Sequence, residues 1–415
     1  MFRKIKQLNK LADYFGLTDK LVNHYIFGYT LIYLSCSFVF IPSLNASYEL
    51  TNISNSIIIY LLCTAIPTTI ISFFGLRLFS LNKLKCILIS SLAFFVFSNL
   101  LLILCYRMKF IVCFFVICFL KSAAIALYAP LSDTLVNLTF SHDTKSFSRI
   151  HSFITWLTYL GMTIMAFAGA WFSNLYGFVN TLIIQALVIC GVIIIYVFIN
   201  VTTLALKQPL KQNGNKIRYP TIINYQVVSH LLRSIVPGIL NSLMPIWGLT
   251  VLSLNSKEYG FIYSMSGVFL ILGGVVCNMS FCNKEIEKKN STVLLSTLTI
   301  YSLLLFISFI KEDSQWFLIW LCAACFFAMI SWISQKIYYL RFNISKTNSE
   351  VSAFSYSFYQ RFGMLLGLII AMLINSYLDT QYLIYINSIF LIVSGIILII
   401  PKITVKESLV IQEEA

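Results

Sequence analysis

Long apolar runs separated by short polar segments make up nearly the whole chain. Crossing a bilayer core about 30 Å thick takes about 20 helical residues at 1.5 Å of rise each, and the runs reach this length. In the first half, the runs predict helices over 24–44, 56–75, 84–105, 110–131, 150–172 and 179–200. In the second half, they predict helices over 224–252, 258–281, 291–310, 315–339, 351–375 and 382–400. The pattern therefore predicts an all-α polytopic membrane protein with twelve transmembrane helices.

The composition agrees with this pattern. Of the 415 residues, 59% are hydrophobic and 11% are charged, whereas a soluble domain is about 45–50% apolar and about 25% charged. These values exclude a soluble enzyme and a nucleic-acid-binding protein. The 11 cysteines follow no disulfide or metal-site spacing, and Cys322 and Cys325 lie within an apolar run, which is typical of core packing. We therefore expect no metal, no cofactor and no nucleic-acid partner.

The basic residues gather in every second loop. The sequence holds 29 Lys and Arg against 15 Asp and Glu, a net charge of +14. The predicted outer loops contain only Arg107, Lys109, Lys257 and Lys311, whereas the tails and the predicted inner loops contain most of the others. Because basic residues favour the cytoplasmic side, we expect both termini to be cytoplasmic and the protein to lie in the inner (cytoplasmic) membrane.

A basic segment divides the chain into two similar halves. We expect an N-terminal six-helix bundle over 1–200, a cytoplasmic linker over 201–221 and a C-terminal six-helix bundle with a short tail over 222–415. Three pairs of residues recur at nearly the same spacing in the two halves: Pro42 with Pro245 at the end of the first helix, Lys83 with Lys284, and Gly161 with Gly363. Two bundles related by a pseudo-two-fold axis are a common transporter construction.

Twelve spans, a six-plus-six division and a short basic central loop resemble the major facilitator superfamily over the whole chain. That family's loop between helices two and three begins with Gly and ends with basic residues, and Gly75 and Lys83 match these positions. Phe79 and Ser80 replace its Asp and Arg, so the charge contacts of this loop are not implied.

The fourth predicted helix carries a second resemblance. Lys121 lies where many family members have a buried basic residue, and Pro130, Leu131 and Asp133 match a Pro-Leu-x-Asp stretch. These residues resemble the lactose-permease and phenylpropionate-permease-like branch. The superfamily resemblance implies alternating-access transport of a small molecule.

Three basic residues lie deep within predicted helices: Lys121, Arg233 and Arg361. A charge at the bilayer centre costs about 2.5–3.5 kcal/mol on insertion scales, so such residues usually face a wet cavity or a partner. No Asp or Glu lies equally deep by this pattern, and Asp133 is about 18 Å along the helix from Lys121. A cationic cavity suits an anionic substrate, because Arg and Lys bind carboxylate and phosphate groups.

Polar side chains recur at helical spacing around these bases. The predicted substrate-binding residues are Lys121, Arg233, Arg361, Asn241, Tyr128, Tyr29 and Tyr33. The predicted gating or coupling residues are His230, Pro237, Gly75, Lys83 and Asp133. Each base has an alternative role as a structural hydrogen-bond donor between helices, and each tyrosine as a packing residue. Gly363 and Gly367 predict close helix packing.

The sequence thus predicts a transporter, secondary active or facilitated, that carries a small organic anion. The alternative is a neutral sugar or drug efflux transporter of the same superfamily, in which the three bases are structural. A membrane-embedded enzyme is more remote, because His142 and Asp143 are the only adjacent pair of candidate catalytic groups. The expected partners are the lipid bilayer, the substrate, and a proton or counter-anion for coupling, and we expect a monomer.

Overall fold

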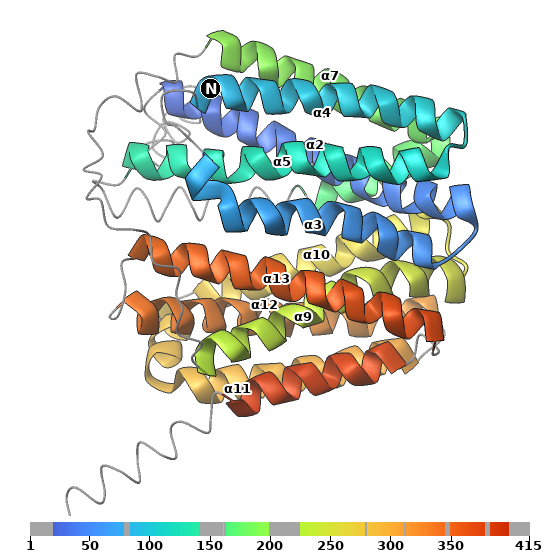
Figure 1. The fold of residues 1–415 in the computed structure, drawn as a ribbon. Coiled ribbons are helices and arrows are strands. Elements are labelled where there is room, and N and C mark those ends of the chain that lie inside the picture. Colours follow the sequence, from blue (N-terminus) through green and yellow to red (C-terminus); the bar gives the residue numbers. More distant parts are fainter. Residues whose placement is uncertain are drawn as a thin grey trace, which may run out of the picture. The chain divides into compact units, whose positions relative to one another are not determined.

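The structure is a computed structural model, and it describes residues 20–78, 84–140, 161, 163–198, 225–278, 280–310, 313–344, 349–377 and 382–397 (Figure 1). Lys83 and the predicted linker 201–221 lie outside these residues. The described chain is helical and contains no strand. The prediction of an all-α protein is confirmed.

The first half contains α2 (Lys20–Thr51), α3 (Asn55–Leu78), α4 (Leu84–Arg107), α5 (Ile111–Phe140), a helix over 163–176 and α7 (Phe178–Phe198). The second half contains α9 (Tyr225–Ile246) with the π-helix η2 (Trp247–Val251), α10 (Ser256–Asn278), α11 (Ser280–Ile310), α12 (Ser314–Ile344), α13 (Ser349–Tyr377) and a helix over 382–397. Among the described residues, 8 helices are long and apolar enough to cross a membrane. The chain is an integral, multi-pass membrane protein.

Several helices are longer than the apolar runs that predicted them. Helix α5 continues to Phe140, beyond the predicted end at residue 131, so Asp133 lies within it. Helix α11 begins at Ser280, whereas the apolar run begins at residue 291. Hydropathy reports the part of a helix that matches the bilayer, and the backbone hydrogen bonds continue past that point wherever propensity allows.

The prediction that the first helix ends near Pro42 is wrong, because α2 continues to Thr51 with Pro42 inside it. Proline has no N–H, so the carbonyl of Phe38 loses its donor four residues later. Gly169 of the 163–176 helix packs against this carbonyl so closely that a methyl group there would overlap the oxygen. Membrane helices tolerate proline where a neighbouring helix covers the freed group.

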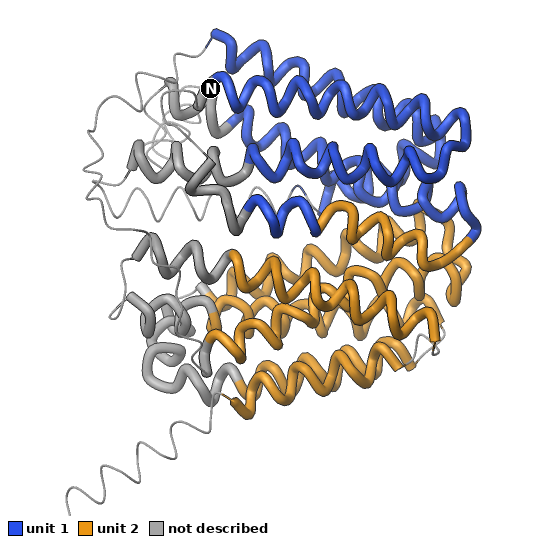
Figure 2. The backbone as a smooth tube through the Cα atoms, in the orientation of Figure 1, with its two compact units in different colours: residues 1–52, 66–213 blue, residues 53–65, 214–415 orange. Residues whose placement is uncertain are grey.

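The chain divides into two compact units, which Figure 2 distinguishes by colour. Unit 1 comprises Met1–Asn52 and Ile66–Asn213, and unit 2 comprises Ile53–Ala65 and Gly214–Ala415. The start of α3 therefore groups with unit 2. Polar contacts explain this grouping: Asn375 of α13 donates a hydrogen bond to the side-chain oxygen of Asn55, and Asn55 donates one to the hydroxyl of Ser376, 3.1 Å away.

Small residues allow α9 and α13 to pack at backbone distance in unit 2. A methyl group added to Gly367 would overlap the carbonyl oxygen of Ile235, and one added to Gly238 would overlap that of Met364. A methyl group added to Gly363 would likewise overlap the side chain of Ser234. The close packing predicted for Gly363 and Gly367 is confirmed, with α9 as the partner helix.

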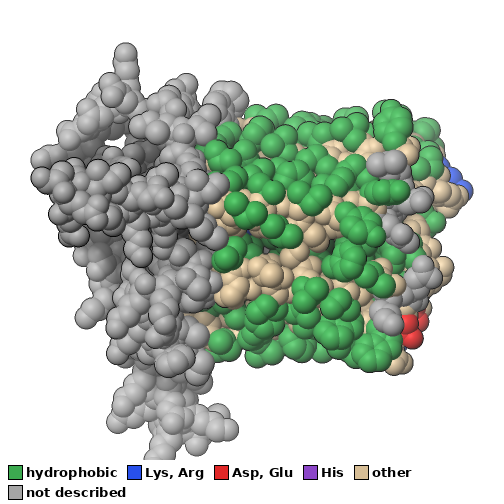
Figure 3. Space-filling view, turned by 90° about the horizontal axis from the view of Figure 1, so that it is seen from below, with side chains coloured by type: hydrophobic (Ala, Val, Ile, Leu, Met, Phe, Trp, Pro, Cys, Tyr) green, Lys and Arg blue, Asp and Glu red, His purple; other side chains and the backbone are tan. Residues whose placement is uncertain are grey.

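The surface of the described residues is that of a protein in lipid. Large apolar side chains such as Val112, Leu187 and Phe198 are exposed. Figure 3 shows a face on which hydrophobic side chains predominate among the described residues, and the few charged side chains of these residues in view lie at one end. Such a surface is stable only when hydrocarbon covers it.

Candidate substrate-binding site

Lys121 lies in the middle of α5, inside unit 1. Its Nζ donates a hydrogen bond to Oε1 of Gln185 on α7, at 2.8 Å. The Nε2 of Gln185 donates in turn to the backbone oxygen of Ser35 on α2, at 3.0 Å. One lysine and one glutamine thereby connect three helices of unit 1.

The surroundings of Lys121 are neutral in the described part of the chain. Its Nζ lies 4.9 Å from the centre of the Phe95 ring on α4, a cation–π contact. The thiols of Cys36 and Cys118 lie close enough to interact with its charge. Its hydrogen-bond partner is an amide oxygen, and no carboxylate contacts it among the described residues. These groups solvate the ammonium without neutralising it.

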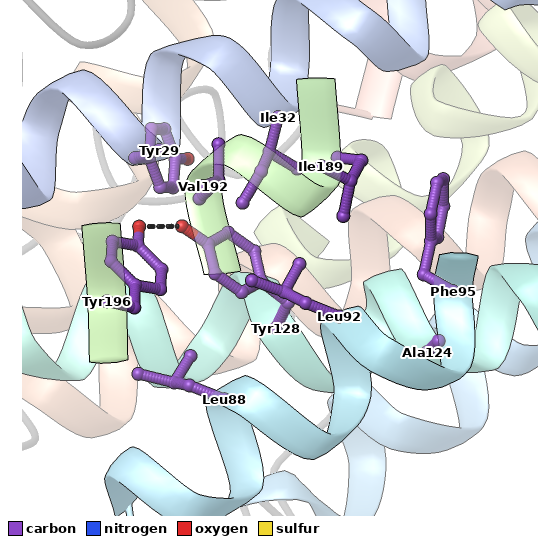
Figure 4. Close-up of a cluster of buried hydrophobic side chains, with 10 residues drawn as sticks. All are labelled: Tyr29, Ile32, Leu88, Leu92, Phe95, Ala124, Tyr128, Ile189, Val192 and Tyr196. Carbon is purple, nitrogen blue, oxygen red and sulfur yellow. Dashed lines mark hydrogen bonds between the residues drawn. The ribbon is translucent and has the colours of Figure 1, made fainter. Parts of the chain in front are cut away.

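Three tyrosines belong to a cluster of buried side chains in unit 1 (Figure 4). The hydroxyl oxygens of Tyr128 and Tyr196 are 2.6 Å apart and share a hydrogen bond. The rings of Tyr29 and Tyr33 lie 4.5 Å apart, centre to centre, and Tyr29 lies 6.1 Å from Tyr128. Phe95 belongs to the same buried cluster and also contacts Lys121.

The tyrosines differ in exposure. Tyr128 is 0% exposed and Tyr29 7%, so both are packed within unit 1. Tyr33 is half-buried and therefore keeps open surface. Among these three tyrosines, Tyr33 therefore has the largest exposed fraction.

Arg233 occupies a different environment, inside unit 2. It lies on α9, is 7% exposed, and binds α12 through both terminal nitrogens. Nη1 donates to the backbone oxygen of Ser331 at 2.9 Å and to Oε1 of Gln335. Nη2 donates to the Ser331 hydroxyl at 2.7 Å and to the backbone oxygen of Ala328 at 3.3 Å. The guanidinium thus fastens α9 to α12.

A glutamine extends this network as well. The Nε2 of Gln335 donates to the Ser229 hydroxyl at 3.4 Å, and Ser229 donates to the backbone oxygen of Ser394 at 2.8 Å. Each unit therefore pairs a base inside its helices with a buried glutamine, and in unit 2 it is Ser229 that extends the network to a third helix. Within the part of the chain that the structure describes, the Lys121 ammonium donates to one amide oxygen, whereas the Arg233 guanidinium donates at least four hydrogen bonds to α12.

The structure places the other predicted residues as follows. Arg361 on α13 and Asn241 on α9 are half-buried, and His230 on α9 is 2% exposed. Pro237 lies within α9, one turn beyond Arg233, and Gly75 lies in the last turn of α3. Asp133 is in α5, but its side chain lies outside the described residues, as does the whole of Lys83.

Sequence reasoning missed the partners of the two bases. Gln185 stands in an otherwise apolar run, and a buried amide there is a signal of the same kind as a buried charge. Ser331 and Gln335 are four residues apart on one face of α12, which is also a readable pattern. Phe95 and Tyr196 carried no signal, because aromatic residues are frequent throughout the helices.

No protein-family model and no curated protein sequence matches the chain. Its structure is similar to that of a nucleoside transporter, NupG, with a TM-score of 0.66 and 14% identity over 91% of this chain and 98% of that one. It is also similar to a bacterial homologue of the iron transporter ferroportin in an inward-facing state, with a TM-score of 0.70 and 12% identity over 92% and 98%. A third similar structure is that of a bacterial metal transporter, with a TM-score of 0.65 and 14% identity over 92% and 98%. The chain therefore has the major facilitator fold of these transporters, as its sequence layout predicted.

Proposed function

We propose that the protein moves a small organic anion across the membrane by alternating access, as a secondary active or facilitated transporter. Lys121 is the residue that binds the anion. Similarity to structures of three transporters supports the transport mechanism. The charge of the substrate follows from the site itself.

The observation that carries the proposal is the neutral environment of the half-buried Lys121 ammonium. Lys121 is held by the Gln185 amide and the Phe95 ring. Placing a charge at the bilayer centre costs about 2.5–3.5 kcal/mol on insertion scales. An anion that reaches Lys121 gains a charge-assisted hydrogen bond in a medium of low dielectric constant. A metal cation is disfavoured at the same site, because the ammonium repels it.

Arg233 is less available than Lys121 for binding the substrate. Its terminal nitrogens donate four hydrogen bonds to α12, and these would have to break before both nitrogens could bind a carboxylate. We assign it first to holding α9 against α12. Arg361, Asn241, Tyr33, Tyr29 and Tyr128 stay predicted contacts, and His230, Pro237, Gly75, Lys83 and Asp133 stay predicted gating or coupling residues. We place the protein in the cytoplasmic membrane, with both termini inside.

A thermal-shift screen tests the proposal, because a ligand that binds the native state raises its melting temperature by mass action. The purified protein is mixed with organic anions and with neutral compounds matched to them in size. A ligand at 100 times its Kd stabilises the native state by about 2.7 kcal/mol. We expect this shift with anions for the wild type and its loss in Lys121→Gln.

Lys257→Gln is the matched control, because it removes the same charge from an exposed position at the start of α10. It should leave the anion shift unchanged. Uptake of the best anion into proteoliposomes then tests transport. If neutral compounds stabilise the protein equally, and Lys121→Gln has no effect, the base is structural and the neutral sugar or drug alternative replaces this proposal.

A further inference from the structure

We propose that Gln185 is a positioning residue that determines the charge selectivity of the Lys121 site. It holds the ammonium in place without neutralising it, so that the positive charge remains available to a substrate. This inference rests on the proposed function, because it assigns the selectivity of the same site.

The backbone fixes the orientation of the Gln185 amide. A backbone carbonyl only accepts hydrogen bonds, so the group facing the Ser35 oxygen must be the NH₂ end of the side chain. The amide oxygen then faces Lys121, which can only donate. Gln185 is 1% exposed, so solvent does not compete for either bond. The amide is therefore locked with its acceptor on the ammonium.

The neutrality of this acceptor has a chemical consequence. A glutamate at the same position would place a carboxylate at hydrogen-bond distance from Nζ, and the two charges would form a buried ion pair. An incoming anion would then meet a neutral pair and a nearby negative oxygen. Glutamine and glutamate have nearly the same shape, so the difference between them at this position is one of charge and of the NH₂ donor group.

Unit 2 uses a glutamine differently. Gln335 accepts from Arg233, but that guanidinium also binds Ser331 and Ala328. In unit 2, the Arg233 guanidinium therefore donates hydrogen bonds to backbone and side-chain oxygens together. In unit 1, the amide of Gln185 is the one hydrogen-bond acceptor recorded for Lys121 within the described residues. The Lys121 ammonium therefore stays without a described counter-ion as long as the side chain at position 185 is uncharged.

The test compares Gln185→Glu with Gln185→Met, which removes both hydrogen bonds and adds no charge. Binding of the best anion from the screen is measured by titration with the melting temperature as readout, beside its neutral analogue. We expect Gln185→Glu to weaken anion binding by about 10- to 100-fold, the range for hydrogen bonds to charged groups. Gln185→Met should retain the preference for the anion over the neutral analogue.

Two results would overturn the inference while the anion proposal stands. In one, Gln185→Glu binds the anion within about threefold of the wild type, where a lost charge-assisted bond predicts at least tenfold. In the other, Gln185→Met loses as much of the preference for the anion as Gln185→Glu does. The loss would then come from the missing hydrogen bonds and not from the added charge. If the wild type binds no anion at all, the proposed function itself has failed.

A second pair of variants serves if Gln185→Glu does not fold. The Cys36 thiol on α2 interacts with the charge of Lys121. Cys36→Asp introduces a carboxylate from another helix, and Cys36→Ser is its neutral control. If neutral partners set the selectivity, Cys36→Asp must weaken anion binding and Cys36→Ser must not. Equal anion binding by the two variants contradicts the inference.

Discussion

Arg233 and Ser331 are joined twice, because Nη1 binds the serine's backbone oxygen at 2.9 Å and Nη2 binds its hydroxyl at 2.7 Å. The planar fork of the guanidinium makes this double contact possible, and a lysine ammonium has no equivalent geometry. The interaction fastens α9 to α12 in the middle of unit 2. The two bases therefore differ in role, since the Lys121 ammonium donates to a single amide among the described residues.

We expect Arg233→Gln to destabilise the protein by about 2–4 kcal/mol, because it leaves several buried acceptors on α12 without a donor. Arg233→Lys should recover only part of this loss. The measurement is thermal denaturation in detergent, with Arg107→Gln, at an exposed helix end, as the control. A melting temperature of Arg233→Gln equal to that of the control would contradict the structural role.

We expect Gly367→Ala to destabilise unit 2 by more than about 2 kcal/mol, because overpacking forces the helices apart. A methyl group there would overlap the carbonyl oxygen of Ile235 on α9. Gly191→Ala is the matched control, since a methyl group at Gly191 of α7 meets nothing within 4 Å. Alanine favours the helix by about 0.5–1 kcal/mol over glycine, so Gly191→Ala should be neutral or stabilising. Equal melting temperatures for the two variants would disprove the close crossing.

The hydrogen bond between Tyr128 and Tyr196 predicts a non-additive pair of substitutions. Each hydroxyl lies against the other at 2.6 Å, so Tyr128→Phe and Tyr196→Phe should each cost about 1 kcal/mol. The double variant should be less destabilised than the sum of the two single variants, because each removes the same bond. A double-mutant cycle of unfolding free energies measures this coupling. Simple additivity would show that the bond contributes nothing.

Asn99 on α4 predicts a stabilising substitution. It is 0% exposed, and neither side-chain polar atom has a hydrogen-bond partner among the described residues. A buried polar group without a partner costs about 1–3 kcal/mol, so Asn99→Leu should be neutral or should raise the melting temperature. Ser229→Ala is the contrasting variant, because Ser229 is paired with Ser394 and should lose stability. A clear loss of stability in Asn99→Leu would reveal a partner for this amide.

The sequence by itself determined that the chain is all-α and where along it the described apolar helices lie. A bilayer selects helices by apolar length, and apolar length is a sum over consecutive residues. Apolar length alone misplaced the end of α5 at Phe140 and the start of α11 at Ser280, because backbone hydrogen bonds continue past the apolar run. It also misplaced the end of α2 at Pro42, because a neighbouring helix lets α2 continue past this proline.

Only the tertiary structure decided the partners of each base. Lys121 meets Gln185 on another helix because the rotation and register of α5 and α7 bring the two side chains to the same level. The contact of Gly238 and Gly367 likewise positions α9 against α13 in unit 2. Rotation and register follow from side-chain packing over whole helix faces, a property that no local stretch of sequence contains.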